Sequence, residues 1–457
     1  MRRSRPSALA LLFVVAFGAS ARATAEPWRL DDAVGLSDRV SIDFQHRVRY
    51  EHLWDQFRPV LGGNDDIVLL RTLIHGRLRL MDWLDVGAEL QDSRALDGEN
   101  SGFVSNSLIN PAELLQAYAE FGFDEVAGGR LQLRGGRFTL NIGSRRLASR
   151  NGFRNTISSF TGLDATWKSE ALTVRGFWTL PVQRLPFRLD ELRDNEVDFD
   201  EESFDFHFWG LYADGELPWG DSGELYLFGL HSDENTDPPR RRRDLYTPGF
   251  RIYRRPAPGR FDYQIETALQ VGRSRQATSG AGTLDHFAHF FHAELGYSFG
   301  TTWSPRVVVQ YDYASGDNDP DDGDNERFDT LFGDRSFDFG HTSIYGPFAR
   351  ANLFTPGVRV QVKPTPKLSA YASFRAFWLA SRSDVWAGGG NRDPDGDSGR
   401  YVGSQIEMRV RWRIFPKNVT LEGGYAHLFA GEFMDDAPTS PSRGGADYVY
   451  TQIVFEY

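Results

Sequence analysis

Cysteine is absent from the 457 residues, so the chain forms no disulfide and offers no thiolate to a metal. After the first 25 residues no stretch is long and apolar enough to cross a bilayer as a helix, and helical periodicity is hard to find. Acidic residues outnumber basic ones, 63 to 51, and the net charge of -12 argues against nucleic acid as a partner. These absences favour an all-β chain.

Catalytic motifs are missing as well. The sequence has no Gly-x-Ser-x-Gly and no His-Glu-x-x-His, and its glycine-rich turns lack the pattern that cradles a phosphate. His286, His289 and His292 lie close together, but spacings of three place them on different faces of a strand. We therefore expect no enzyme, no cofactor and no metal site here. A catalytic pair at the rim of a barrel stays an alternative, because residues distant in the chain can meet.

The first 25 residues have the three parts of a secretory signal peptide. Three arginines give a basic start, residues 8–17 are apolar, and small residues at 21–25 offer cleavage sites. The apolar run is too short to span a bilayer as a helix. We predict residues 1–25 as a signal peptide and residues 26–457 as one domain, either a soluble periplasmic protein or an outer-membrane barrel.

Apolar and polar residues alternate through most of the mature chain. The runs exceed the ~9–11 residues with which a tilted strand crosses a bilayer. The pattern predicts about eighteen strands, at 39–51, 68–80, 83–93, 113–123, 130–141, 157–168, 171–181, 204–217, 223–232, 244–254, 260–273, 286–300, 304–315, 351–363, 367–381, 400–413, 417–430 and 446–457.

The connections between the predicted strands alternate in length. Those after even-numbered strands are short, such as 81–82 and 301–303, whereas those after odd-numbered strands are mostly long and polar, such as 94–112 and 316–350. Outer-membrane barrels have short periplasmic turns, long extracellular loops and an even number of antiparallel strands. The alternation therefore predicts a transmembrane antiparallel β-barrel in the bacterial outer membrane.

The last strand ends the chain on an aromatic residue. Residues 447–457 have the period of a strand, with one greasier face, and stop at Tyr457. The closing strands of outer-membrane barrels resemble this stretch, and the barrel-assembly machinery reads their terminal aromatic. We expect that machinery, membrane lipid and lipopolysaccharide as partners. The alternative is an ordinary last strand of a soluble sheet.

Strand parity separates many arginines from the apolar residues. An arginine facing lipid at the midplane costs about 2–4 kcal/mol, so the arginine faces should line the lumen. A bulge expected at Gly135-Gly136 would also turn Arg137 inward. The predicted lumenal residues are Arg47, Arg49, Arg71, Arg77, Arg134, Arg137, Arg175, Arg359, Arg409 and Arg411.

An arginine-rich lumen predicts an anion-selective pore. Arginine is permanently charged and binds carboxylates through a planar fork, and rings of arginine select for anions. The alternative is that lumenal acids such as Glu51, Asp164 and Glu407 pair with these arginines and merely brace the wall.

Two acidic stretches in the outer loops loosely resemble calcium-binding loops. Aspartates alternate there with glycine and other residues, but neither stretch has the full ligand register with a terminal glutamate. Solvated loops that shape the mouth are the alternative. The weak calcium candidates are Asp317, Asp319, Asp321, Asp393, Asp395 and Asp397.

The chain resembles the alginate export family of outer-membrane proteins. The resemblance rests on Trp83-Leu84, the stretches 89–94 and 115–118, the run from Gly136 to Leu147, Asn155-Thr156, Phe160-Thr161-Gly162 and the later stretch 313–317. Thr161 departs from the family, which usually has aspartate there. The resemblance implies an eighteen-stranded barrel with an arginine-rich constriction that passes a chain of uronates, although many family members have no assigned substrate.

We therefore expect a channel that exports an anionic exopolysaccharide, alginate or a similar uronate polymer, by diffusion through an arginine-lined lumen. Synthesis and periplasmic export proteins would drive the polymer. An uptake porin for small organic anions is the alternative.

Overall fold

The computed structural model describes residues 28–30, 35, 37–59, 61, 63–96, 103–233, 240–275, 282–319, 321–416, 418–441 and 444–457. The signal peptide predicted at 1–25 lies outside these residues. Across the described ranges, no helix has both the length and the apolar character needed to cross a membrane.

Eighteen strands make the wall of the molecule, and their ends lie within three residues of the predicted ones. They are β1 (Val40–Trp54), β2 (Asp65–Met81), β3 (Leu84–Leu96), β4 (Asn110–Val126), β5 (Gly129–Phe138), β6 (Phe160–Lys168), β7 (Leu172–Pro181), β8 (Phe206–Glu216), β9 (Ser222–Ser232), β10 (Arg243–Arg254), β11 (Arg260–Ser274), β12 (Leu284–Ser298), β13 (Arg306–Ala314), β15 (Leu353–Thr365), β16 (Leu368–Trp378), β17 (Tyr401–Phe415), β18 (Val419–Ala430) and β19 (Ala446–Glu456).

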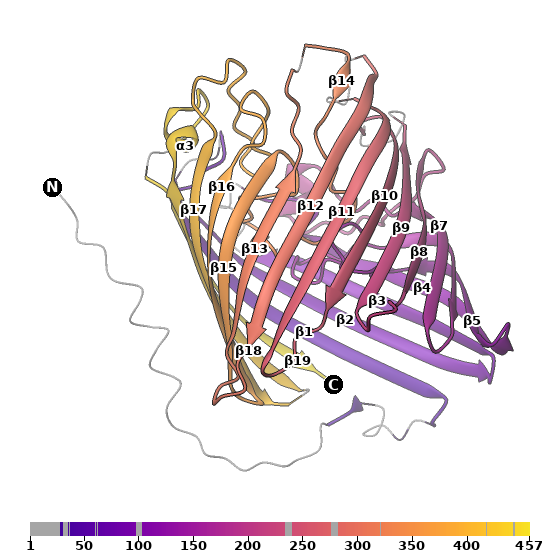
Figure 1. Cartoon of the computed structure of the whole chain (residues 1–457). Helices are drawn as coiled ribbons and strands as arrows, with labels where there is room; N and C mark the ends of the chain where they lie inside the picture. The colour runs from indigo at the N-terminus through magenta and orange to yellow at the C-terminus, as the bar shows by residue number, and fades with distance from the viewer. Residues whose placement is uncertain are drawn as a thin grey trace.

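The sheet closes on itself. Each strand of the wall pairs antiparallel with its neighbours along the chain, and β1 also pairs with β19 (Figure 1). The closing register places His46 opposite Phe455 and Tyr50 opposite Thr451. A closed barrel leaves no unpaired strand edge, so every strand of the wall has a partner on both sides. The predicted antiparallel barrel of about eighteen strands is confirmed.

The remaining short elements lie in loops at one end of the barrel. They are the two-residue strand β14 (Asp324–Asn325), which pairs with β12, and the one-turn helices α2 (Leu189–Arg193) and α3 (Glu432–Asp436). Long connections gather at this end, called here the long-loop end, and tight turns gather at the other, the short-turn end (Figure 1). The predicted alternation of loop length is therefore present.

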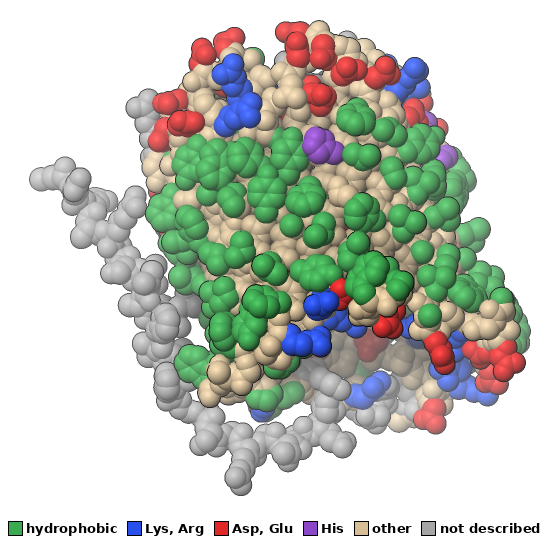
Figure 2. Space-filling model, in the orientation of Figure 1, with side chains coloured by type: hydrophobic (Ala, Val, Ile, Leu, Met, Phe, Trp, Pro, Cys, Tyr) green, Lys and Arg blue, Asp and Glu red, His purple; other side chains and the backbone are tan. Residues whose placement is uncertain are grey.

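On the face of the barrel drawn in Figure 2, exposed apolar side chains form a broad belt between two charged ends. Leu163, Leu211, Leu225 and Val309 each expose more than half of their surface. An exposed apolar area this large is rare on a soluble protein, whereas it is the surface that a barrel presents to lipid.

Two long loops fold back inside the barrel. Phe339, Tyr345 and Phe348 of the 315–352 loop are buried in one cluster with wall residues such as Leu69 and Tyr448. The 139–159 loop packs into a second cluster, with buried residues of β6 to β13 and with Phe328 of the 315–352 loop. Burying a large apolar side chain stabilises by about 1.5–3 kcal/mol, so these loops are firmly seated parts of the lumen.

The bulge predicted at Gly135-Gly136 is wrong. β5 pairs with β4 and with β6 in unbroken register past both glycines, so Arg137 lies on the face opposite to Arg134. A side-chain carbon at Gly136 would lie 2.3 Å from the carbonyl oxygen of Ala117, and its φ is +122°. The glycine therefore permits close backbone approach and does not insert an extra residue.

Candidate functional site

Most of the predicted lumenal arginines meet an acid in the wall. Arg134 and Arg175 lie 2.8 and 2.7 Å from Asp164, and Arg49 lies 3.2 Å from Glu51. Such close pairs balance charge within the wall. The same applies to Arg77 with Asp85 and Glu120, and to Arg411 with Glu422.

Arg47 and Arg71 bind backbone carbonyl groups of a loop and form no ion pair with an acid among the described residues. Arg47 donates hydrogen bonds to the three carbonyl oxygens of residues 152–154 at 2.9–3.3 Å, and Arg71 donates to the first and last of them at 3.0 and 2.9 Å. A guanidinium has five donors in a rigid fork, which suits converging carbonyl groups. These two arginines tie the 139–159 loop to β1 and β2.

Arg359 of β15 and Arg409 of β17 both lie close to one aromatic ring of β16. Their Cζ atoms lie 5.1 and 4.7 Å from the ring centre of Tyr371. The strand of Tyr371, β16, pairs with β15 on one side and with β17 on the other. Within the described part of the chain, neither arginine lies within 4 Å of a carboxylate, and Arg359 reaches only the carbonyl oxygen of Asp338, at 3.5 Å. Of the predicted set, these two are the best placed to meet a passing anion.

Arg137 lies outside the pore because of the unbroken register of β5. Its guanidinium binds Glu113 and Glu202 at 2.5 and 2.8 Å and donates to the carbonyl oxygen of Leu114. Glu202 belongs to the 182–205 loop, so Arg137 fastens that loop to the wall. Its predicted place in the conduction path is wrong.

The loops contribute arginines that strand parity cannot place. Arg154, Arg184 and Arg335 come from the 139–159, 182–205 and 315–352 loops. Among the described residues none of the three forms an ion pair, and Arg184 donates one long hydrogen bond, 3.4 Å, to the hydroxyl of Ser158. The 139–159 loop is locally rich in arginine, but the 315–352 loop is not, so arginine content gives no signal for Arg335.

Burial and neighbouring charges shift the pKa values of these three loop arginines. Burial, and then the charges of Arg154 and Arg58, lowers the pKa of the Arg335 guanidinium to about 9. Burial, and then the charge of Arg154, lowers the pKa of Arg184 to about 10. Burial likewise lowers the pKa of Arg154. The charge of Asp334 opposes the pKa shifts of Arg154 and Arg335, and the charge of Asp200 opposes that of Arg184.

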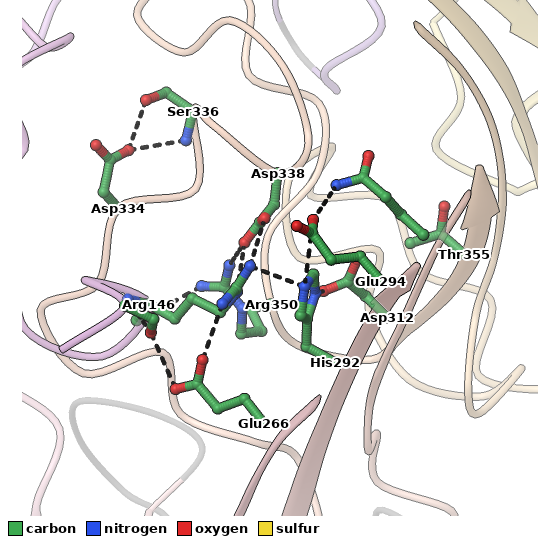
Figure 3. Close-up of polar contacts among 12 residues, drawn as sticks. Arg146, Glu266, His292, Glu294, Asp312, Asp334, Ser336, Asp338, Arg350 and Thr355 are labelled. Carbon is green, nitrogen blue, oxygen red and sulfur yellow. Dashed lines mark hydrogen bonds and ion pairs between the residues drawn. The ribbon is translucent and has the colours of Figure 1, made fainter. Parts of the chain in front are cut away.

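A buried charge network joins the two inner loops to the wall (Figure 3). Asp338 of the 315–352 loop accepts hydrogen bonds from Arg146 of the 139–159 loop at 2.9 and 3.0 Å, and from Arg350 at 2.6 Å. Arg146 also binds Glu266 of β11 at 2.9 Å and contacts His292 of β12 at 2.9 Å. The neighbouring guanidinium charges hold the pKa of Asp338 below its usual range. The network fixes the two loops across the lumen.

Part of this network could in principle hold a metal ion. His292, Asp312 and Asp338 bring three ligand atoms within 4.8 Å of one another. Both carboxylates, however, already bind guanidinium groups, Asp338 through Arg146 and Asp312 through Arg375. A divalent cation would have to displace these charges, so the group is better described as an ion-pair cluster.

The calcium candidates are not brought together. Among the described residues, the cluster at His292 is the single group with metal-ligand geometry. The backbone amide of Ser398 donates to Asp393 at 2.7 Å, which closes that loop on itself. Asp317 and Asp393 are buried, whereas Asp319, Asp321, Asp395 and Asp397 are exposed.

A cavity of about 490 Å³ opens towards the short-turn end. Its lining mixes charges and amides with aromatic rings, and Glu89 on its wall is bound by Arg150 of the 139–159 loop, 3.0 Å from one of its oxygens. The last residue, Tyr457, also lines it and packs edge-on against Trp28 with ring centres 4.9 Å apart. The two ends of the described chain therefore meet beside the seam between β1 and β19.

Solved structures of similar fold are outer-membrane proteins. OpdK from Pseudomonas aeruginosa aligns at a TM-score of 0.57 and 12% identity, over 91% of this chain and 98% of that one. OccK8 (OprE) from the same organism aligns at 0.59 and 11%, over 92% and 98%. A BenF-like porin from Pseudomonas fluorescens Pf-5 aligns at 0.59 and 12%, over 92% and 99%. At such identities the likeness shows the fold alone.

No curated protein matches the sequence. The family of alginate export proteins, in contrast, matches residues 38–444, which is most of the mature chain and the whole barrel up to the last loop. The closed eighteen-strand barrel, its apolar belt and this match place the protein among channels of the bacterial outer membrane, and not among enzymes. The chain belongs to the alginate export family.

Proposed function

We propose that the protein is an anion-selective channel that exports an acidic polysaccharide, alginate or a similar uronate polymer. The observation that carries this proposal is the set of guanidinium groups that form no ion pair among the described residues, Arg359 and Arg409 on the wall and Arg154, Arg184 and Arg335 on the long loops. A net positive lumen inside an acidic protein favours carboxylates over cations. The family match supports a polymer as the substrate.

Uptake of small organic anions is the second candidate. It is favoured by the two inner loops, which the Arg47, Arg71 and Asp338 contacts tie across the lumen and which narrow the path for a chain of sugars. One of the similar structures is OpdK with vanillate, which shows that this fold can accommodate a small aromatic carboxylate in that protein. The arginines suit either substrate, so the width of the path decides between the two.

Single-channel recording with added oligouronates separates the candidates. The mature chain would be refolded into a planar bilayer, and oligomannuronates of increasing length would be added to the short-turn side. A polymer exporter should show block whose residence time grows with chain length, because each further uronate meets another guanidinium. Block that is complete with a single uronate and does not grow would instead favour small anions.

A further inference from the structure

We infer that His292 is a pH-sensitive switch, which joins the two inner loops to the wall while its ring is neutral and loosens them when the ring is protonated. The switch is the contact between His292 of β12 and Arg146 of the 139–159 loop. Acid conditions should break this contact and widen the path through the lumen. The inference goes beyond the proposed function, because it concerns how the path opens and not which solutes pass.

The contacts of His292 determine where its ring carries a proton. Nε2 lies 2.9 Å from a terminal nitrogen of Arg146, and Nδ1 lies 2.7 Å from a carboxylate oxygen of Asp312. A guanidinium group has donors and no acceptor, so Nε2 must accept a hydrogen bond and carries no proton. The neutral ring therefore holds its one proton on Nδ1, from which it donates to Asp312. This arrangement fits the neutral ring and not the protonated one.

A second proton turns the contact with Arg146 into a repulsive one. It would lie on Nε2 and face an N–H of Arg146, so that two donors and two positive charges meet. Glu294, on the same strand, has a carboxylate oxygen 3.9 Å from Nε2 and can accept the new N–H once the ring turns towards it. The protonated ring thus has an acceptor in the protein, but Arg146 loses its contact with β12.

Arg146 connects both inner loops to the wall. It belongs to the 139–159 loop, binds Asp338 of the 315–352 loop at 2.9 and 3.0 Å, and binds Glu266 of β11 at 2.9 Å (Figure 3). Arg146, Asp338, Glu266 and His292 are all buried, so water screens a new charge among them only weakly. A positive charge on His292 would therefore act on both loops through one side chain.

Charges of both signs surround the ring and its partners. The acids are Glu266, Glu294, Asp312 and Asp338, and the arginines are Arg146, Arg306, Arg350 and Arg375. These groups bind one another: Arg306 lies 3.3 Å from Glu294, and Arg350 lies 2.6 Å from Asp338. Because the other arginines are directed at acids, Arg146 is the one whose contact a proton on Nε2 breaks.

The test is single-channel recording in symmetric salt as the pH is lowered from about 8 to about 5, the range in which histidine gains its charge. Loosened loops should appear as transient increases in conductance, whose frequency rises by up to about tenfold per pH unit for one proton. H292Q keeps an acceptor and a donor but cannot titrate, so its increases should be rare and independent of pH. H289Q is the control, because His289 lies exposed on the same strand and stacks on Tyr313, with ring centres 4.9 Å apart.

A second variant tests the route of the proton. E294Q removes the charged acceptor for the new N–H, so the conductance response should move to lower pH. Heat-modifiable electrophoretic mobility verifies that each variant folds, and E294Q keeps the inference testable if H292Q does not. An unchanged response in E294Q would count against the inference.

The remaining outcomes are equally decisive. A wild-type channel without a pH response, or a response that survives in H292Q, would overturn the inference. H341Q removes another buried histidine, which lies 3.5 Å from Glu407, and a response lost in H341Q but kept in H292Q would assign the effect to His341. Ion selectivity is measured separately from the reversal potential, so a cation-selective channel would contradict the proposed function and leave the switch intact.

Discussion

At the scale of single residues, the lumenal arginines divide by their partners. Arg134 and Arg175 share the carboxylate of Asp164, whereas Arg359 and Arg409 lie beside the ring of Tyr371 and have no carboxylate within 4 Å among the described residues. A charge already paired in the wall contributes little field to the pore, and an unpaired one contributes fully. Selectivity should therefore depend on a few arginines and not on their total number.

The double variant R359Q/R409Q tests this division. Removing two unpaired charges should lower the anion-to-cation permeability ratio about ninefold, from roughly threefold for each charge at a distance of about 7 Å. The control R251Q/E224Q removes a pair in which, among the described residues, neither member forms another ion pair, and it should change the ratio little. Reversal potentials in a salt gradient measure both. Equal shifts in the two variants would refute the distinction between paired and unpaired arginines.

The buried carboxyl group of Asp200 should make the stability of the folded 182–205 loop depend on pH. Burial raises the pKa of its carboxyl from 3.8 to about 7. The folded loop therefore binds the proton more tightly than the open loop does, and its stability is greatest below pH 4 and falls as the pH rises to 7. Proteolysis within the loop should become faster over this interval. D200N should flatten the profile, and a profile that keeps its slope in D200N would exclude Asp200 as the cause.

At the scale of elements, the two inner loops depend on one carboxylate. Asp338 accepts hydrogen bonds from Arg146 and Arg350, all of them buried. Replacing one member of a buried ion pair costs about 3–5 kcal/mol because a charge is left unmatched. D338N should therefore release the 315–352 loop, raise the single-channel conductance and increase gating noise. The wall variant D164N is the control, and an unchanged conductance in D338N would show that other contacts hold the loop.

Deletion of Tyr457, which follows the closing strand β19, should impair assembly of the barrel. Tyr457 exchanges backbone hydrogen bonds with Phe44 at 2.9 Å in each direction, and its ring packs on Trp28. Deleting Tyr457 removes the last contacts of the closing pair, β1 with β19. The folded fraction after refolding into detergent should fall, while Y246A, which removes an exposed tyrosine elsewhere on the outer face, should have little effect. Equal folded fractions would contradict this role.

Strand positions could be predicted because residues of the barrel wall alternate between lipid and lumen, a pattern that is visible in short stretches of sequence. Every second residue faces lipid, so alternation alone places β17 and its Arg409 and Arg411 correctly. The rule does not show why a glycine occurs in a strand. At Gly135-Gly136 we predicted a bulge, whereas Gly136 is needed because the backbone of Ala117 approaches it closely. The rule is silent for loops, because Arg154 and Arg335 owe their places to contacts made far along the chain. The positions of these loop arginines therefore could not be predicted from periodicity.

At the scale of the whole molecule, the acidic chain encloses a basic path. The chain carries a net charge of -12, and acidic side chains gather at its long-loop end (Figure 2), whereas wall acids such as Asp164 are paired with arginines. A low-dielectric wall focuses such a field on the lumen, and added salt screens it over about 10 Å at 0.1 M. Anion preference should therefore weaken as the ionic strength rises.

The reversal potential of the unmodified channel in a potassium chloride gradient is the most direct test. The mature chain is refolded into a planar bilayer, with tenfold more salt on one side. The unpaired arginines predict a potential of the sign set by chloride, which decreases in magnitude when both salt concentrations are raised. A potential of the sign set by potassium would mean that the acids dominate the lumen, and the proposal of an anion channel would be contradicted.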